Sequence, residues 1–139
     1  TKVVIRNSNH VRPWQHVLDP LLGYLILAEK QYKNQIKDFE HSWNFGPGKG
    51  NFKKVIDVVK YIKKKEGLKY ILKNTGLHKE TNVLKLNSFK ARKKLKWFCK
   101  WSLIETLNKT IEWNNLVEKG NSAKIVCEKQ FLMHIHNNK

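Results

Sequence analysis

The stretch VRPWQHVLDPLLGYLILAEKQY, residues 11–32, decides how this chain begins to fold. Its first part is extended and polar, and Pro13 suits an edge or a kink of a strand because proline lacks an N–H. Asp19 is then expected to cap a helix whose first residue is Pro20. The apolar residues that follow form a wide stripe, which predicts a deeply buried helix: Leu21, Leu22, Leu25, Ile26 and Ala28.

The polar run before this helix holds four large side chains, those of Arg12, Trp14, Gln15 and His16. Ordering such side chains costs conformational entropy, so we expect each of them to have a role. The structural alternatives are a surface ion pair for Arg12, core packing for Trp14, and support of the strand by Gln15 and His16.

Outward from this stretch, four extended segments are expected. Residues 3–5 are β-branched, residues 11–17 are the polar run, and residues 68–73 alternate in the manner of a strand. The WNFG sequence at residues 43–46 predicts another brief strand before a glycine-rich turn.

Three further helices are expected from their start and stop signals. Asn51 opens a helix that Gly67 ends, and Ser88 opens a short one. A capping box at Ser102 opens a last long helix that Gly120 ends.

The predicted fold class is α+β, because the strands do not alternate with helices as in a Rossmann fold. Residues 1–120 are expected to form one domain, and residues 121–139, with weak periodicity, a tail. The chain opens almost directly in a strand, so we expect it to be a piece of something longer.

The net charge is +17, from 28 basic and 11 acidic residues, which points to an anionic partner. Only Arg6, Arg12 and Arg92 are arginines, although sites that clamp phosphates or read bases favour arginine. Most lysines are therefore expected to be solvated surface. The alternative is a free-standing nucleic-acid-binding module, supported by the charge and by interleaved aromatic residues: Phe89, Trp97, Phe98 and Trp101.

Several classes of site are not expected. Cys99 and Cys127 are too few for a disulfide framework and follow no secretory signal, which predicts a reduced, cytoplasmic protein. No apolar run reaches the ~20 residues of a membrane span. His134 and His136 lack a second ligand pair, so no metal site is expected. The GPGKG sequence at 46–50 has the spacing of a turn rather than of a phosphate cradle, and no nucleophile stands beside a base.

Four segments nevertheless carry a resemblance: residues 11–32, WNFGP, ETNVLKLNSFKARKKLKW and KWSLIETLNKTIEW. Their order and spacing are similar to those in the C-terminal part of CDP-glucose 4,6-dehydratases, NAD-dependent members of the extended short-chain dehydrogenase/reductase family. The resemblance runs from about Val3 to Glu118.

The resemblance implies that residues 1–120 are the small substrate-binding domain of such an enzyme, without its Rossmann domain. In the family, the Rossmann domain binds NAD, and the complete enzyme, usually a homo-oligomer, converts CDP-glucose to CDP-4-keto-6-deoxyglucose for deoxysugar and polysaccharide synthesis. This chain lacks the glycine-rich dinucleotide turn. It is therefore not expected to bind NAD or to transfer a hydride alone, and no catalytic residue is assigned to it.

The resemblance also implies a substrate-binding role for Arg12, Trp14, Lys79 and Glu80. In relatives, an arginine at position 12 contacts the diphosphate of the nucleotide sugar, and an aromatic residue at position 14 lies nearby. A loop at residues 76–86 closes over the nucleotide, with an acidic residue at the position of Glu80 and, here, Lys79 in reach of a phosphate.

The chain departs from the family pattern at positions that bear on substrate affinity. Leu77 stands where many relatives have arginine, and Lys79 lies within a changed Pro-His-Glu motif. Asn87 replaces the usual aspartate and Lys96 the usual glycine.

Overall fold

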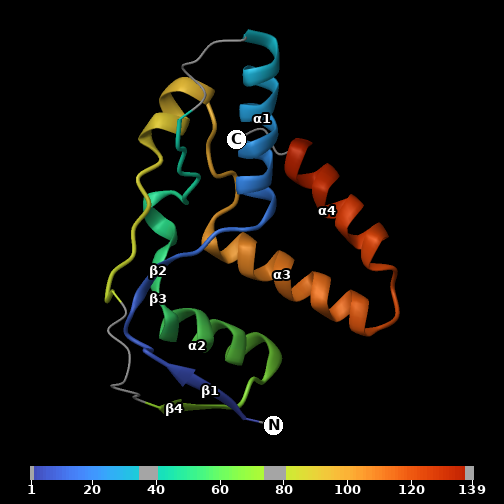
Figure 1. Ribbon diagram of the computed structural model, residues 1–139. Coiled ribbons are helices and arrows are strands. Elements are labelled where there is room, and N and C mark those ends of the chain that lie inside the picture. The colour runs from blue at the N-terminus through green and yellow to red at the C-terminus, as the bar shows by residue number, and fades with distance from the viewer. Residues whose placement is uncertain (1, 35–40, 74–80, 137–139) are drawn as a thin grey trace.

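The computed structural model describes residues 2–34, 41–73 and 81–136 (Figure 1). Its strands form two separate pairs. β1 (Val3–Arg6) runs parallel to β4 (Tyr70–Lys73), and β2 (Val11–Pro13) runs antiparallel to β3 (Phe52–Lys54). Helices make up most of the other described elements, so the α+β prediction is confirmed.

Four α-helices and two short helical turns make up the rest of the described regular structure. Figure 1 shows α3 and α4 as a helical hairpin whose open end faces α1. The helical elements are α1 (Leu18–Asn34), η2 (Lys49–Asn51), α2 (Val55–Glu66), η3 (Ala91–Leu95), α3 (Leu103–Glu118) and α4 (Ala123–His136).

Several local signals in the sequence are confirmed. Gly67 ends α2 in the left-handed conformation, with φ 67°, and its N–H donates to Lys63 O. The capping box of α3 is complete, because Ser102 Oγ accepts from the N–H of Glu105 while the Glu105 carboxylate accepts from the N–H of Ser102. Gly120 follows α3 with φ 89°.

The prediction that Asp19 caps α1 is wrong. The helix begins at Leu18, whose N–H donates to Nδ1 of His16 at 3.3 Å, so Asp19 lies inside the first turn and does not cap it. The predicted deep burial is also wrong for this chain. The outer side of α1 is open to solvent, with Leu21, Tyr24 and Leu25 exposed by 45%, 54% and 61%.

The prediction for Asn51 is wrong as well, because three extended residues, β3, separate it from α2. Lys54 is the N-cap of α2. Asn51 is buried and instead donates to Trp101 O and accepts from the N–H of Leu103, so it supports the start of α3. No strand forms at residues 43–46; the extended chain there pairs with no neighbouring strand among the described residues.

Within residues 121–139, the stretch expected to be a tail, residues 123–136 form the helix α4. The buried residues of this helix are Val126, Gln130 and His134, spaced four apart. Two of these three are polar, so a search for apolar periodicity finds only a weak pattern. The buried face of α4 is held by hydrogen bonds: Gln130 Nε2 donates to Lys109 O, and His134 contacts Asp19.

The main hydrophobic cluster joins α1, the extended chain at 43–46 and η3. Its buried members are Phe45, Ala91, Leu95 and Trp97, with the rings of Phe45 and Trp97 edge-to-face at 5.1 Å. Gly23 lets α1 approach this cluster, because a Cβ atom there would lie 2.4 Å from Cδ1 of Phe45.

Candidate substrate-binding site

The candidate site starts from the extended chain at residues 10–16. Its backbone forms hydrogen bonds on both sides. On one side β2 pairs with β3. On the other side the N–H of Val11 donates to Asn82 O, and Val11 O accepts from the N–H of Leu84. Trp14 N donates to Asn51 O at 3.1 Å. This double pairing fixes the positions from which Arg12 and Trp14 extend.

Arg12 reaches across to the chain that follows residue 80. One nitrogen of its guanidinium donates to Thr81 O and to Val11 O, both at 3.0 Å, and the other lies 3.1 Å from Nδ1 of His10. Arg12 is half-buried. Its guanidinium is thus positioned beside the immediate sequence neighbour of Glu80.

Arg12 also stands opposite Lys53 in the β2–β3 register. Residues directly opposite each other in an antiparallel pair project from the same side of the ladder, and like charges there repel. An anion bound between them would be attracted by both cations. This side of the ladder therefore suits a phosphate group.

Trp14 is half-buried and lies outside the set of buried hydrophobic residues. Its Nε1 donates to Lys53 O at 3.0 Å, so the indole lies against the backbone of the strand that carries the second cation. Core packing alone does not account for this placement.

Gln15 and His16 have structural contacts, as the alternative for these two residues predicted. Gln15 Nε2 donates to Phe45 O at 2.7 Å, which ties the run to the hydrophobic cluster. His16 is buried, accepts from the N–H of Leu18, and meets the Trp101 ring edge-on at 4.6 Å between centroids.

Sequence reasoning missed the buried role of Asp19, the most buried polar residue in the described part of the chain. Its side chain is 0% exposed, and Oδ1 accepts from the N–H of Lys100 at 2.8 Å and lies 2.9 Å from Nε2 of His134. Its backbone oxygen accepts from Nε1 of Trp97. The sequence signal at Asp19 was that of a helix cap, and the partners come from distant segments that no local pattern identifies.

Cys99 completes this cluster by donating its thiol proton to Oδ2 of Asp19 at 3.1 Å. Burial, and after it the nearby Asp19 carboxylate, raises the pKa of Cys99 to about 12. The thiol therefore stays protonated at neutral pH and acts as a hydrogen-bond donor rather than a nucleophile.

The remaining residues implied by the family resemblance fall in two groups. Leu77, Lys79 and Glu80 lie outside the described residues. Asn87 caps the turn before η3, since its Oδ1 accepts from the N–H of Phe89 at 2.9 Å. Lys96 has φ 53°, the left-handed conformation that favours glycine, which gives a physical reason for the glycine usual at this position.

Tyr61 and Lys65 on α2 have the spacing Tyr-x-x-x-Lys, which sequence reasoning overlooked. The Tyr61 hydroxyl is 2.6 Å from Oδ1 of Asn108, and the Lys65 ammonium lies over the Tyr61 ring at 5.8 Å. These contacts join α2 to α3 at the surface. They assign no chemistry to the pair.

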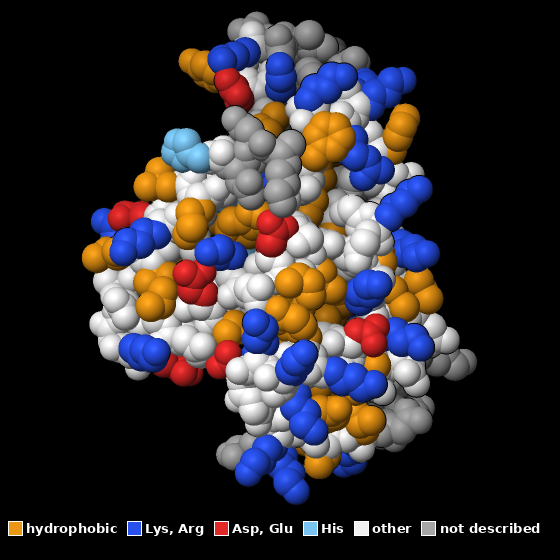
Figure 2. Space-filling model, turned by 180° about the vertical axis from the view of Figure 1, so that it is seen from behind, with side chains coloured by type: hydrophobic (Ala, Val, Ile, Leu, Met, Phe, Trp, Pro, Cys, Tyr) orange, Lys and Arg blue, Asp and Glu red, His pale blue; other side chains and the backbone are white. Residues whose placement is uncertain are grey.

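A second cationic surface borders the glycine-rich turn. A hollow of about 450 Å³ there is lined by Lys49, Lys85 and Arg92 together with the ring of Phe52. On the face shown in Figure 2, Lys and Arg side chains are widely spread and alternate with apolar ones. That distribution agrees with lysines that mostly serve as solvated surface.

The comparison with known proteins finds a relative over almost the whole chain. This chain is 35% identical over 131 residues to the CDP-glucose 4,6-dehydratase of Salmonella typhimurium, and the match covers 93% of this chain and 36% of that enzyme. The chain is homologous to part of that enzyme. The resemblance stated from the motifs is thereby confirmed, and the chain spans about a third of the length of the curated relative it matches.

No family model matches the chain. The comparisons give no support to the nucleic-acid-binding alternative. Among the described helices, none has the length and apolar character needed to cross a membrane.

Proposed function

We propose that residues 1–120 are the nucleotide-sugar-binding part of a CDP-glucose 4,6-dehydratase and that the complete enzyme works in the cytoplasm. The similarity to the Salmonella enzyme supports the substrate class. The observation that carries the proposal is the placement of Arg12 opposite Lys53 and against Thr81.

In this proposal, the cations on the β2–β3 ladder bind the diphosphate. A guanidinium can donate two parallel N–H bonds to phosphate oxygens, whereas an ammonium acts as a point charge. Arg12 then supplies orientation and Lys53 supplies additional attraction. Trp14 lies beside the bound nucleotide. Lys79 and Glu80, next in sequence to Thr81, complete the site from the adjoining loop.

The described residues do not fit NAD. A dinucleotide cradle needs a glycine-rich turn that joins a strand to the N-terminus of a helix. Here the turn containing Gly48 leads through η2 into the antiparallel strand β3, and α2 begins only at Val55. We assign NAD binding and the redox chemistry to a Rossmann domain in the same or a separate chain.

The exposed side of α1 is proposed as the contact for that domain. Leu21, Tyr24 and Leu25 lie open on consecutive turns of one helix. The homologous enzyme is almost three times as long as the matched segment, since the match covers 36% of it, so further protein is available to cover this surface. Family members are usually homo-oligomers, and the complete enzyme is proposed to be one as well.

The test is calorimetric titration of CDP-glucose into the chain reconstituted with a Rossmann domain of the family. A charge-assisted hydrogen bond contributes about 1.5–3 kcal/mol, so Arg12→Ala should weaken binding roughly ten- to a hundredfold. Arg12→Lys should recover only part of this, and NAD affinity should stay unchanged. The matched control is Arg6→Ala on exposed β1.

Equal losses for Arg6→Ala and Arg12→Ala would show that Arg12 contributes only general charge and would overturn the proposed contact. Circular dichroism of Arg12→Ala checks the fold, because an unfolded variant would identify Arg12 as a structural residue.

A further inference from the structure

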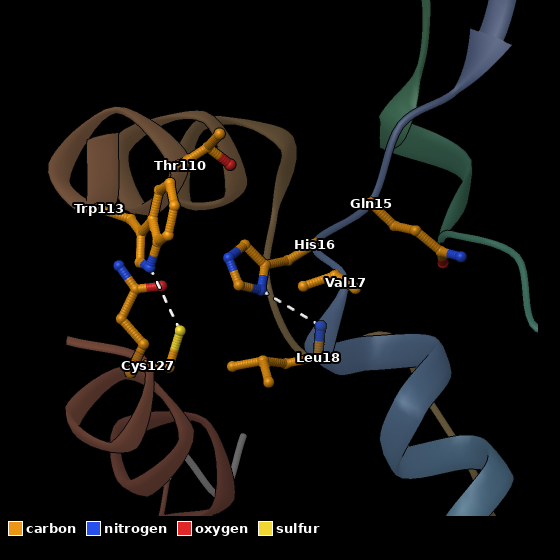
Figure 3. Close-up of a pocket in the computed structure, with 8 residues that line it drawn as sticks. Gln15, His16, Val17, Leu18, Thr110, Trp113 and Cys127 are labelled. Carbon is orange, nitrogen blue, oxygen red and sulfur yellow. Dashed lines mark hydrogen bonds between the residues drawn. The ribbon is translucent and has the colours of Figure 1, made fainter. Parts of the chain in front are cut away.

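A pocket of about 480 Å³ lies between the end of the polar run and the α3–α4 hairpin (Figure 3). Its volume lies within the roughly 300–1,000 Å³ of small-molecule sites. Val17, Leu18 and Trp113 form apolar walls, and the described lining residues include no Lys, Arg, Asp or Glu. A nucleotide sugar, with its charged diphosphate, does not match this lining.

His16 places a hydrogen-bond donor in this pocket. Its Nδ1 accepts from the N–H of Leu18, and burial lowers the pKa of the ring below 6.5, so at neutral pH the single ring proton is on Nε2. Figure 3 shows the ring extending from its backbone toward Trp113 and Cys127. The residue is only 7% exposed, and within the described parts of the chain Nε2 has no hydrogen-bond partner.

Most other donors around the pocket make hydrogen bonds within the chain. Trp113 Nε1 donates to Sγ of Cys127 at 3.2 Å, and the Thr110 hydroxyl donates to Thr106 O at 2.9 Å. The side-chain amides of Gln15 and Gln130 donate to Phe45 O and Lys109 O, and each amide has a second N–H. His16 Nε2 is the donor nitrogen of the lining that has no bond to another described residue. Nε2 is not among the fully buried unpaired side-chain atoms of the described residues, so it is open to the pocket. An acceptor on a ligand can therefore take the place of water at this donor.

We propose that this pocket binds a small uncharged molecule with an apolar ring and one hydrogen-bond acceptor, such as a carbonyl oxygen, which accepts from Nε2 of His16. The ring contacts Leu18 and Trp113. The proposal concerns a site and a ligand class separate from the nucleotide sugar, so it can fail or succeed independently of the proposed function.

Cys127 provides the readout, because it lines the pocket and is exposed. Cys99 does not interfere, since its pKa of about 12 keeps the thiol protonated and slow to react with a disulfide reagent. The probe is acetophenone, and its near-isostere α-methylstyrene lacks the carbonyl acceptor. The experiment measures the rate at which Cys127 reacts with Ellman's reagent as each probe is titrated into the chain.

Acetophenone should slow the reaction saturably, and α-methylstyrene should require roughly tenfold higher concentration, the effect of one hydrogen bond. Thr110→Trp, which fills the pocket from α3, should abolish the protection. Glu112→Trp, on the other side of the same helix, should leave it intact. His16→Phe should remove the preference for the ketone.

Absence of saturable protection, or equal protection in Thr110→Trp, would overturn the site. Equal protection by the two probes in the unmodified chain would overturn the proposed ligand class, and this comparison needs no variant at His16 to fold.

Discussion

Nε2 of His134 lies 2.9 Å from Oδ1 of Asp19, and the two side chains are only 1% and 0% exposed. The contact joins the last turn of α4 to the first turn of α1. The Trp101 ring meets the His134 ring edge-on at 4.8 Å between centroids and the His16 ring edge-on at 4.6 Å. A buried polar cluster, rather than an apolar seam, thus holds the C-terminal helix in place.

Replacement of Asp19 should therefore destabilise the whole chain. Asp19→Leu leaves the Lys100 N–H and His134 without their acceptor, while the Cys99 thiol keeps Trp101 O as a second acceptor. Each unsatisfied buried donor costs about 1–3 kcal/mol, so we expect a loss of at least about 2 kcal/mol in urea unfolding. Asp19→Asn, which retains one acceptor oxygen, should lose less. An Asp19→Leu variant as stable as the unmodified chain would contradict the role of the cluster.

Lys96→Gly should stabilise the chain by about 1 kcal/mol, because the left-handed conformation at φ 53° strains a residue that has a Cβ. The matched control is Lys60→Gly at an exposed position inside α2, where glycine should cost about 1 kcal/mol. Thermal unfolding of both variants measures the difference. A loss of stability in Lys96→Gly would mean that the lysine side chain itself contributes at this position.

His16 should make folding stability depend on pH. Burial lowers its pKa, an effect that the nearby Asp19 carboxylate opposes and that His134 and Lys109 reinforce. The unfolded chain then binds a proton at a higher pH than the folded chain, so stability is lost as the pH falls below about 6.5. His16→Gln should flatten this slope between about pH 7 and pH 5, by at most about 1.4 kcal/mol per pH unit. His136→Gln, at an exposed position, is the control, and identical slopes in the two variants would refute the prediction.

The open side of α1 should bind a hydrophobic dye in the isolated chain. Leu25→Lys should reduce dye binding and aggregation while changing the free energy of unfolding by no more than about 0.5 kcal/mol, because Leu25 is 61% exposed. Leu27, two positions along, packs against the hydrophobic cluster, and Leu27→Lys should cost at least about 2 kcal/mol. A monodisperse, dye-silent unmodified chain would count against an uncovered interface.

The sequence predicted those parts of the fold that depend on neighbouring residues. Gly67 requires a left-handed conformation, and the Ser102 capping box needs only residues within one turn. Asp19 carried a correct signal for a helix start, but its partners lie at residues 97–100 and 134, and local chemistry cannot identify partners at such distance. The buried polar face of α4 could not be predicted either, because Gln130 and His134 bond distant residues, Lys109 and Asp19.

In the candidate site, the substrate-binding role of Arg12 and Trp14 was predicted from the family resemblance and not from a sequence pattern. What no pattern could supply was the cross-strand register that brings Lys53 opposite Arg12, because β3 is three residues long and has no alternation of its own. The pocket beside His16 was equally hidden, since its walls come from three segments distant in sequence.

The Asp19–His134 contact joins residues 115 positions apart, and this separation bears on how the chain folds as it leaves the ribosome. Long-range contacts form slowly because a large loop has to close before they are made. Until α4 has emerged, Asp19 in the first turn of α1 lacks its contact with His134. Completion of this contact is thus delayed until residue 134 has left the ribosome, and a ribosome-stalled chain ending before residue 134 should remain sensitive to protease at α1.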